Sequence, residues 1–268
     1  MTDKLSGDPA RLLGSDEPPP FMVYRPEGRS AFFLTCDHAG DLIPRKLGTL
    51  GLGPHDLVRH IAWDIGAAGL SRILSERLDA TLVTQTYSRL VIDCNRATHR
   101  PDSIAKRSEN SDVPGNQNVT PEEAETRARE IFWPYHAAIE QQLDARQAAG
   151  RPTILIAMHS FTPVYKGEQR PWHIGLLYNR DARLATILKD ILDGEPGLCI
   201  GNNQPYHVHD DSDYGIPVHG ERRGLPHAGF EIRQDLIAGI AGQEQWTQRM
   251  TQLLRDLLAL LPGDAKPG

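Results

Sequence analysis

The sequence predicts an α/β fold of three α/β/α layers around a mixed, mainly parallel central sheet. Short apolar runs typical of buried strands alternate with segments of helical periodicity between residues 31 and 261. Side chains suited to catalysis or metal binding stand at or near the ends of these runs, among them His38, Arg96, His159 and Glu231. Ligands of open α/β sheets bind beyond the carboxyl ends of the strands, so a site is expected there.

The first half of the chain gives an arm, two strands, a helix and a third strand. Residues 1–30 are rich in proline, glycine and charge, and they predict an extended arm. A single domain should follow over 31–261. Apolar runs predict strands at 31–35, 80–84 and 90–93, and apolar residues at helical spacing predict a helix over 56–78.

The second half begins with the clearest helix signal. Thr120 is a typical N-cap, Pro121 suits the first helical position, and the helix should run to about residue 149, with Pro134 a candidate kink. Strands are expected at 153–158, 173–178 and 228–232, helices at 181–192 and 243–261, and a flexible tail at 262–268. The stretch 201–226 predicts a long loop, which in a compact domain is usually functional.

Length and composition are those of an ordinary globular protein. The 268 residues are 39% hydrophobic and 24% charged, with a formal net charge of −6. No basic run and no long apolar stretch occurs, so neither nucleic acid nor a membrane is an expected partner. Three widely spaced cysteines, Cys36, Cys94 and Cys199, and the lack of an apolar leader after Met1 predict a cytoplasmic protein with free thiols.

Two strand ends carry side chains that bind metals. His38 and Asp41 follow the strand at 31–35, and His159 follows the strand at 153–158. Imidazole nitrogen and carboxylate oxygen are both zinc ligands, and a catalytic site needs three protein ligands and one open position. The simpler interpretation is a polar strand end whose histidine is satisfied by local hydrogen bonds.

Two further pairs are rival candidates for a metal. His207 and His209 would share one strand face, and His60 and Asp64 lie four residues apart on the predicted helix. A solvated loop explains the first pair more simply, and a hydrogen bond on a helix surface explains the second.

Residues 89–96 offer a group that would bind a carboxylate. Arg89 precedes an apolar run, and Asp93, Asn95 and Arg96 end it. The planar arginine fork matches a carboxylate, and asparagine adds an amide donor. The alternative is a structural ion pair between arginine and aspartate. No phosphate-binding glycine loop and no nucleophile elbow occurs, which disfavours nucleotide chemistry and serine hydrolysis.

Glu231 lies inside the apolar run at 228–232, where a carboxylate is disfavoured unless it has a role or a partner. Burial would raise its pKa toward the range of a general base. The alternative is an ion pair with Arg233, two residues on.

Six motifs follow one another along the chain. They are Cys36-Asp37-His38-Ala39-Gly40, Arg59-His60-Ile61-Ala62-Trp63-Asp64-Ile65-Gly66-Ala67, Asp93-Cys94-Asn95-Arg96, Pro134-Tyr135-His136, His159-Ser160-Phe161 and Glu231-Ile232-Arg233-Gln234-Asp235-Leu236-Ile237. Together they resemble the N-formylglutamate amidohydrolase family over about residues 30–260. The resemblance implies a phosphorylase/hydrolase-like fold, shared with zinc carboxypeptidases and aspartoacylases.

The resemblance also implies roles for particular residues. It makes His38, Asp41 and His159 the ligands of Zn²⁺ or another divalent metal, and Glu231 the base. Position 41 departs from the zinc peptidases, which have glutamate there, so a shorter side chain must reach the metal. Asp37 or Asp64 would be the substitutes.

The resulting hypothesis is a metal-dependent amidohydrolase that cleaves the linear amide of a small N-acyl amino acid such as N-formylglutamate. By resemblance Asn95 and Arg96, with help from Arg89, would orient the substrate carboxylate. Tyr206 and His219, on the long loop, would close over the substrate. The alternative is a non-catalytic protein that binds a carboxylate ligand on the same scaffold.

Overall fold

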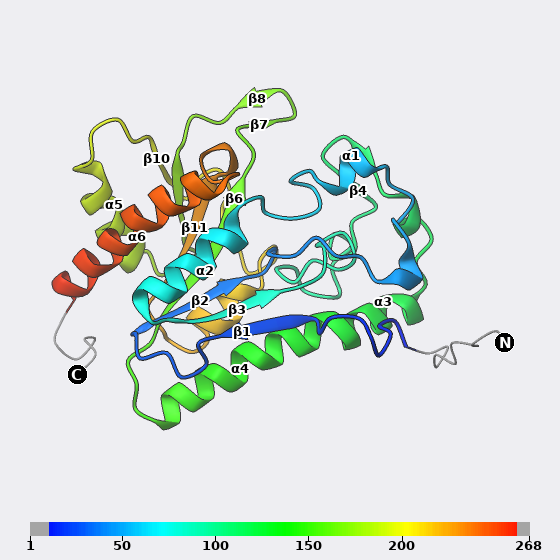
Figure 1. Cartoon of the computed structure of the whole chain (residues 1–268), viewed down its shortest axis with the longest axis horizontal. Coiled ribbons are helices and arrows are strands. Elements are labelled where there is room, and N and C mark those ends of the chain that lie inside the picture. The colour runs from blue at the N-terminus through cyan, green and yellow to red at the C-terminus, as the bar shows by residue number, and fades with distance from the viewer. Residues whose placement is uncertain (1–10, 262–268) are drawn as a thin grey trace.

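The structure is a computed structural model that describes residues 11–261. Seven strands form one sheet in the order β1-β3-β2-β6-β11-β9-β10 (Figure 1). They are β1 Phe21–Tyr24, β2 Phe32–Cys36, β3 Thr81–Gln85, β6 Ile154–Phe161, β9 Ile174–Leu177, β10 Ile200–Asn202 and β11 His227–Arg233. β2, β3, β6 and β11 run parallel to one another, whereas β1 and β9 are antiparallel to their neighbours β3 and β11. The predicted mixed, mainly parallel sheet is confirmed.

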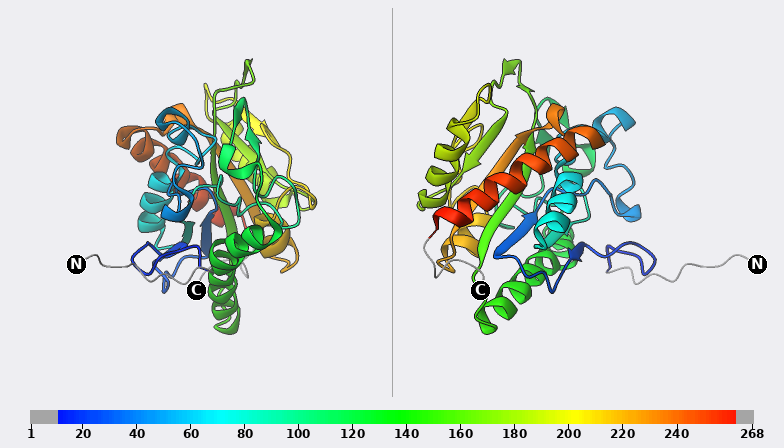
Figure 2. Two further views of the ribbon diagram at one scale, coloured as in Figure 1. Left: turned by 90° about the vertical axis from the view of Figure 1, so that its right-hand side faces the viewer. Right: turned by 60° about the vertical axis from the view of Figure 1, so that its left-hand side comes forward.

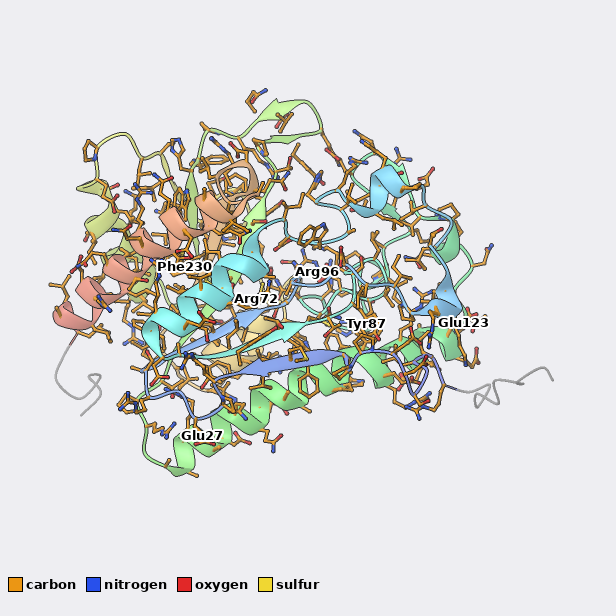
Figure 3. All side chains as sticks on the ribbon, viewed as in Figure 1. Glu27, Arg72, Tyr87, Arg96, Glu123 and Phe230 are labelled. Carbon is orange, nitrogen blue, oxygen red and sulfur yellow. The ribbon has the colours of Figure 1, made fainter. Side chains whose placement is uncertain are left out.

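Helices cover both faces of this sheet, which gives the three layers (Figure 2). One face carries α2 Ala67–Leu78, α5 Arg183–Asp193 and α6 Ile240–Leu260, and the other carries α3 Pro121–Arg127 and α4 Trp133–Ala148. Successive strand side chains point to opposite faces, so in β2 Phe32 and Leu34 join the first core and Phe33 joins the second. Figure 3 shows Phe230 among the side chains of the first core and Glu123 at the periphery.

The remaining elements are short. They are α1 Pro54–Leu57, the hairpins β4 Arg107–Ser108 with β5 Ser111–Asp112 and β7 Val164–Tyr165 with β8 Glu168–Gln169, the 3-10 turns Arg45–Leu47, Pro114–Asn116 and Gln234–Leu236, and the π-helical segments Ala128–Phe132 and Ile216–Glu221. The predicted helix from Pro121 thus continues into α4 through a π-helical segment. Its capping box is present, since Thr120 and Glu123 exchange hydrogen bonds of 2.9 and 3.2 Å. Pro134 stands in the first turn of α4, where proline is tolerated.

The predicted helix at 56–78 is broken in the structure. α1 ends at Leu57 and α2 begins at Ala67, and the residues between them are irregular. Gly66 has a φ of +82°, and a Cβ there would lie 2.1 Å from the carbonyl oxygen of Ile237. Only glycine permits this turn into α2. The backbone N–H of Asp64 donates to the carbonyl of His38 at 2.9 Å, so Asp64 is held beside the end of β2.

The strand predicted at 90–93 is wrong. These residues form turns: the N–H of Val91 donates to Ser88, and that of Asp93 donates to Ser103. Leu90, Val91 and Ile92 are nevertheless buried in the second core. The apolar run therefore indicates burial correctly but not the secondary structure, because a short apolar run does not distinguish a strand from any other buried segment.

The described part of the predicted arm is attached to the body. Residues 21–24 pair with β3 as the antiparallel edge strand, and the N–H groups of Leu12 and Leu13 donate to the carboxylate of Glu130. Residues 1–10 of the arm and the tail at 262–268 lie outside the described residues. Within residues 11–261, no helix has the length and apolar character needed to cross a membrane.

Candidate metal centre and active site

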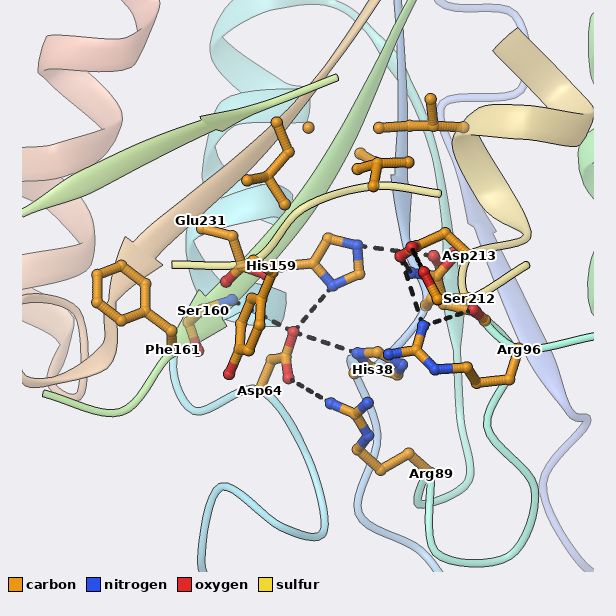
Figure 4. Close-up of a pocket in the computed structure, with 18 of the residues that line it drawn as sticks. His38, Asp64, Arg89, Arg96, His159, Ser160, Phe161, Ser212, Asp213 and Glu231 are labelled. Carbon is orange, nitrogen blue, oxygen red and sulfur yellow. Dashed lines mark hydrogen bonds and ion pairs between the residues drawn. The ribbon is translucent and has the colours of Figure 1, made fainter. Parts of the chain in front are cut away.

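Three buried side chains meet at the carboxyl ends of β2 and β6. One ligand atom from each of His38, Asp64 and His159 lies within 4.8 Å of those of the other two. Asp64 Oδ2 is 3.4 Å from His38 Nδ1 and 3.0 Å from His159 Nδ1 (Figure 4). His38 is the second residue after β2, and His159 lies within β6. Asp64 reaches them from the irregular segment before α2.

The third residue of this group corrects an expectation from the sequence. Asp41 is exposed and does not line the cavity, whereas Asp64 is 3% exposed. A Cβ on Gly40 would lie 1.9 Å from the carbonyl oxygen of Thr86, and Leu42 bridges to Tyr87. The backbone at Gly40 therefore packs closely against the segment after β3, and the side chain of Asp41 lies at the surface.

A carboxylate also faces the second ring nitrogen of His38. Asp93 Oδ1 lies 2.8 Å from His38 Nε2, and Arg89 donates two hydrogen bonds of 2.6 and 3.0 Å to Asp93 Oδ2. Burial opposes the charge of Asp93, but Arg89 and His38 hold its pKa well below the ordinary value. Because Asp93 is an acceptor, the Nε2 atom of His38 carries a proton. The ion pair that the sequence offered as the alternative is therefore present between Arg89 and Asp93, and it orients a candidate ligand.

His159 is placed in a similar way. Asp37 Oδ2 lies 3.7 Å from His159 Nε2, and Tyr135 Oη donates to Asp37 Oδ1 at 2.5 Å. Asp37 is 2% exposed, and its Oδ2 has no hydrogen-bond partner among the described residues. Asp37 thus lies behind His159 as Asp93 lies behind His38, with a neutral tyrosine in place of an arginine as its anchor.

The donor set and its surroundings fit a divalent metal. Both ring nitrogens of each histidine face a carboxylate oxygen, an arrangement that requires positive charge from imidazolium protons or from a cation. Burial opposes protonation of His159, but the hydrogen bond and charge of Asp64 raise its pKa to about 9. Burial likewise opposes the charge of Asp64, and the two histidines hold its pKa well below the ordinary value. Two histidines and one carboxylate form a known type of catalytic zinc site.

Glu231 lies beside this group. It is opposite His159 in the register of the parallel strands β11 and β6, so the two side chains leave the same face of the sheet. Burial raises the pKa of Glu231 to about 7, and its Oε2 has no hydrogen-bond partner among residues 11–261. The alternative ion pair with Arg233 does not form, because Arg233 pairs with Asp235 at 2.8 Å.

Asn95 and Arg96 line the same cavity, and there they already hold a carboxylate. Asn95 Nδ2 donates to Asp213 Oδ1 at 3.1 Å. Arg96 Nη1 donates to the same oxygen at 3.4 Å (Figure 4). The N–H groups of Tyr214 and Gly215 donate to Asn95 Oδ1 and fix its amide. Nothing in the sequence singles out Asp213, which stands in the long loop and meets Asn95 only through folding.

The two loop residues predicted to close over the substrate differ in position. Tyr206 lines the cavity and accepts a hydrogen bond of 3.0 Å from Arg170. His219 does not line it: it is 1% exposed in the π-helical segment, with Nε2 at 2.8 Å from Nδ1 of His136. The structure therefore places Tyr206, and not His219, at the cavity, because the composition of a loop does not tell which of its histidines is buried.

Among the described residues neither rival pair belongs as a pair to a three-ligand group, and of their four residues only Asp64 joins one. His207 and His209 are exposed, with ring centroids 4.4 Å apart. His60 lines the cavity, and its Nε2 lies 3.3 Å from Glu109.

Fold and site together define an α/β/α enzyme whose imidazole- and carboxylate-lined cavity, of about 370 Å³, lies at the carboxyl ends of its parallel strands. The particular family follows from a direct match. The model of the N-formylglutamate amidohydrolase family matches residues 30–238, and the chain belongs to that family. It is accordingly a hydrolase that acts on an amide.

The crystal structures that resemble this chain include the following two. That of a gene product from Agrobacterium tumefaciens is 36% identical, with 93% of this chain and 98% of that chain covered and a TM-score of 0.90. That of the N-formylglutamate amidohydrolase from Ralstonia eutropha is 19% identical, with 90% and 98% covered and a TM-score of 0.63. At this lower identity the likeness establishes the fold. No curated protein matches the chain.

Proposed function

We propose that this protein hydrolyses the amide of a small N-acyl amino acid, such as N-formylglutamate, with a divalent metal, Zn²⁺ in the first place. His38, Asp64 and His159 would hold the ion. The observation that carries the proposal is the position of Glu231, a buried carboxylate with a free oxygen that shares a cavity with this group.

In this proposal Glu231 is the general base and then the general acid. When bound, the ion supplies polarisation of the scissile carbonyl and lowers the pKa of water. A carboxyl group with a pKa of about 7 accepts a proton from the attacking water and returns it to the leaving nitrogen near neutral pH. His159 lies on the adjacent strand, so proton transfer and metal binding would occur side by side.

Asn95 and Arg96 would bind the substrate carboxylate. They hold the carboxylate of Asp213 in the structure, which supports their capacity to hold another. Arg89 is already committed to Asp93 and lies 3.6 Å from Asp64, so its part is to orient these two groups. Tyr206 would contact the bound substrate from the long loop. Positioning of this kind contributes strongly to rate.

The test combines metal content with amide hydrolysis. Purified protein is loaded with Zn²⁺ and assayed for amine release from N-formylglutamate and N-acetylglutamate. We expect Glu231→Gln to lower kcat by at least about 100-fold while Zn²⁺ still binds. Glu125→Gln, at an exposed position of α3, is the matched control and should be unaffected. Equal rates for Glu231→Gln and wild type would reject the role of the base.

The same experiment separates the non-catalytic alternative. A carboxylate-binding protein would bind the acidic ligands without releasing amine, and its Arg96→Ala variant would no longer bind them. We further infer a cytosolic location from the three cysteines, all of them free thiols.

A further inference from the structure

The cavity has an aliphatic part that the reaction proposed above does not use. Ala157, Leu177, Val208 and Ile216 form a hydrophobic cluster of their own, separate from the two main cores, and all four line the cavity. Their side chains belong to β6, the end of β9 and the long loop. Aliphatic side chains that line a cavity bind apolar groups by removing them from water.

The strand register places this cluster next to the candidate catalytic residues. His159, Glu231 and Gly175 stand opposite one another on β6, β11 and β9. Two residues deeper, on the same face, stand Ala157, Gly229 and Leu177. Two residues of a strand span roughly 6.6 Å, so the cluster lies within the length of a small substrate from the candidate catalytic residues.

Small residues let the cluster close over the sheet. Gly229 has no side chain, and a Cβ there would lie 3.1 Å from both Ile216 Cδ1 and Leu177 Cβ. Ile216 and Leu177 therefore pack directly onto β11 and form an aliphatic wall. Val208 completes it from the long loop, and each of the four cluster residues is at most 5% exposed.

The cavity thus has two kinds of lining. Asn95 and Arg96 suit a carboxylate, whereas the cluster offers no side-chain hydrogen-bonding group at all. Neither end of N-formylglutamate matches the aliphatic lining. Its acyl group ends in a hydrogen atom, and its side chain ends in a second carboxylate, which is costly to place against aliphatic surface.

We propose that these residues form an aliphatic subsite and that the preferred substrate carries a short aliphatic group of one to four carbons. This inference rests on the proposed function and names its substrate class. The aliphatic group has two possible sources, the acyl chain or the side chain of the amino acid, and the experiment distinguishes them.

The experiment measures kcat/KM of the metal-loaded protein on two series. The acyl series is N-formyl-, N-acetyl-, N-propionyl- and N-butyrylglutamate, and the side-chain series is N-formylalanine, N-formylnorvaline and N-formylleucine. We expect one series to rise by about fourfold for each added methylene group, the ratio expected for burial of one CH₂. If no compound of either series has a higher kcat/KM than N-formylglutamate, the inference is overturned.

A variant locates the effect in the subsite. Val208→Thr keeps the shape and replaces one methyl group by a hydroxyl, so we expect it to reduce the preference for the longest substrate several-fold. Val23→Thr, on the edge strand β1, is the control for the same change outside the cavity. An equal preference in Val208→Thr and Val23→Thr would contradict the assignment.

Binding data separate failure of the subsite from failure of the proposed function. If the wild-type protein hydrolyses no member of either series, the proposed function fails. The dissociation constants of the same compounds, measured by titration calorimetry, then still test the subsite, since the same fourfold steps are expected in Kd. A flat series in Kd would reject it.

Discussion

Asp64 Oδ2 lies 3.0 Å from Nδ1 of His159, although 95 residues separate the two in the chain. The N–H of Ser160 donates to the same oxygen at 3.2 Å, so the end of β6 holds this carboxylate with backbone as well as side chain. His38 approaches it from β2 at 3.4 Å. One carboxylate oxygen is therefore the meeting point of two strand ends.

Asp64→Asn should weaken the binding of Zn²⁺ by at least about 100-fold, since the change removes a charged ligand and leaves the shape. Affinity is measured by competition with a chromogenic chelator. Asp41→Asn is the control, because the sequence predicts Asp41 as the ligand. It should bind Zn²⁺ as wild type does, because Asp41 is exposed. The reverse result would restore Asp41 as the ligand.

Asp37→Asn should lower Zn²⁺ affinity by about 10- to 100-fold, the usual effect of losing a carboxylate that orients a ligating histidine. Asp37 Oδ2 faces His159 Nε2 at 3.7 Å, and an amide no longer provides the negative charge there. Tyr135→Phe, which removes only the donor to Asp37, should have a smaller effect in the same direction. Wild-type affinity in Asp37→Asn would exclude this role.

Asp213→Asn should lower KM for an acidic substrate and leave kcat unchanged, because Asp213 competes for Asn95 and Arg96. Partly exposed ion pairs contribute up to about 1 kcal/mol, so the decrease should not exceed about fivefold. Steady-state kinetics measures it, with Asp211→Asn, an exposed loop position, as the control. A raised KM would instead make Asp213 part of the substrate site.

The free energy of unfolding should fall as the pH is lowered below about 6.5, because of His136 and His219. Burial lowers the pKa of His219 to about 3 and that of His136 well below its ordinary value. Below pH 6.5 these histidines are protonated in the unfolded chain but stay neutral in the folded protein. The stability that the two neutral histidines contribute is therefore complete above pH 6.5 and is lost toward pH 3.

Each histidine should contribute a slope of up to about 1.4 kcal/mol per pH unit in that window. Urea unfolding between pH 7 and pH 4.5 measures it. His219→Gln should have a shallower slope than wild type, and His55→Gln, at an exposed position, should keep the wild-type slope. Identical slopes in all three proteins would contradict the pKa assignment.

Much of the fold follows from local patterns. The strands expected around residues 31–35, 80–84, 153–158, 173–178 and 228–232 are confirmed to within three residues at each end. The threonine N-cap and Pro121 are at the start of α3 as expected. The strand at 90–93 and the unbroken helix at 56–78 are wrong, because burial and helical spacing do not reveal turns that tertiary contacts impose.

The amino-acid sequence by itself determined which side chains stand at the strand ends, since an apolar run and the polar residue that ends it are local features. These local features place His38, His159 and Glu231 at this edge of the sheet. Only the tertiary structure decided which carboxylate joins them. The contact of Gly66 with Ile237 breaks the helix, and that break carries Asp64 inward, while the contact of Gly40 with Thr86 leaves Asp41 at the surface.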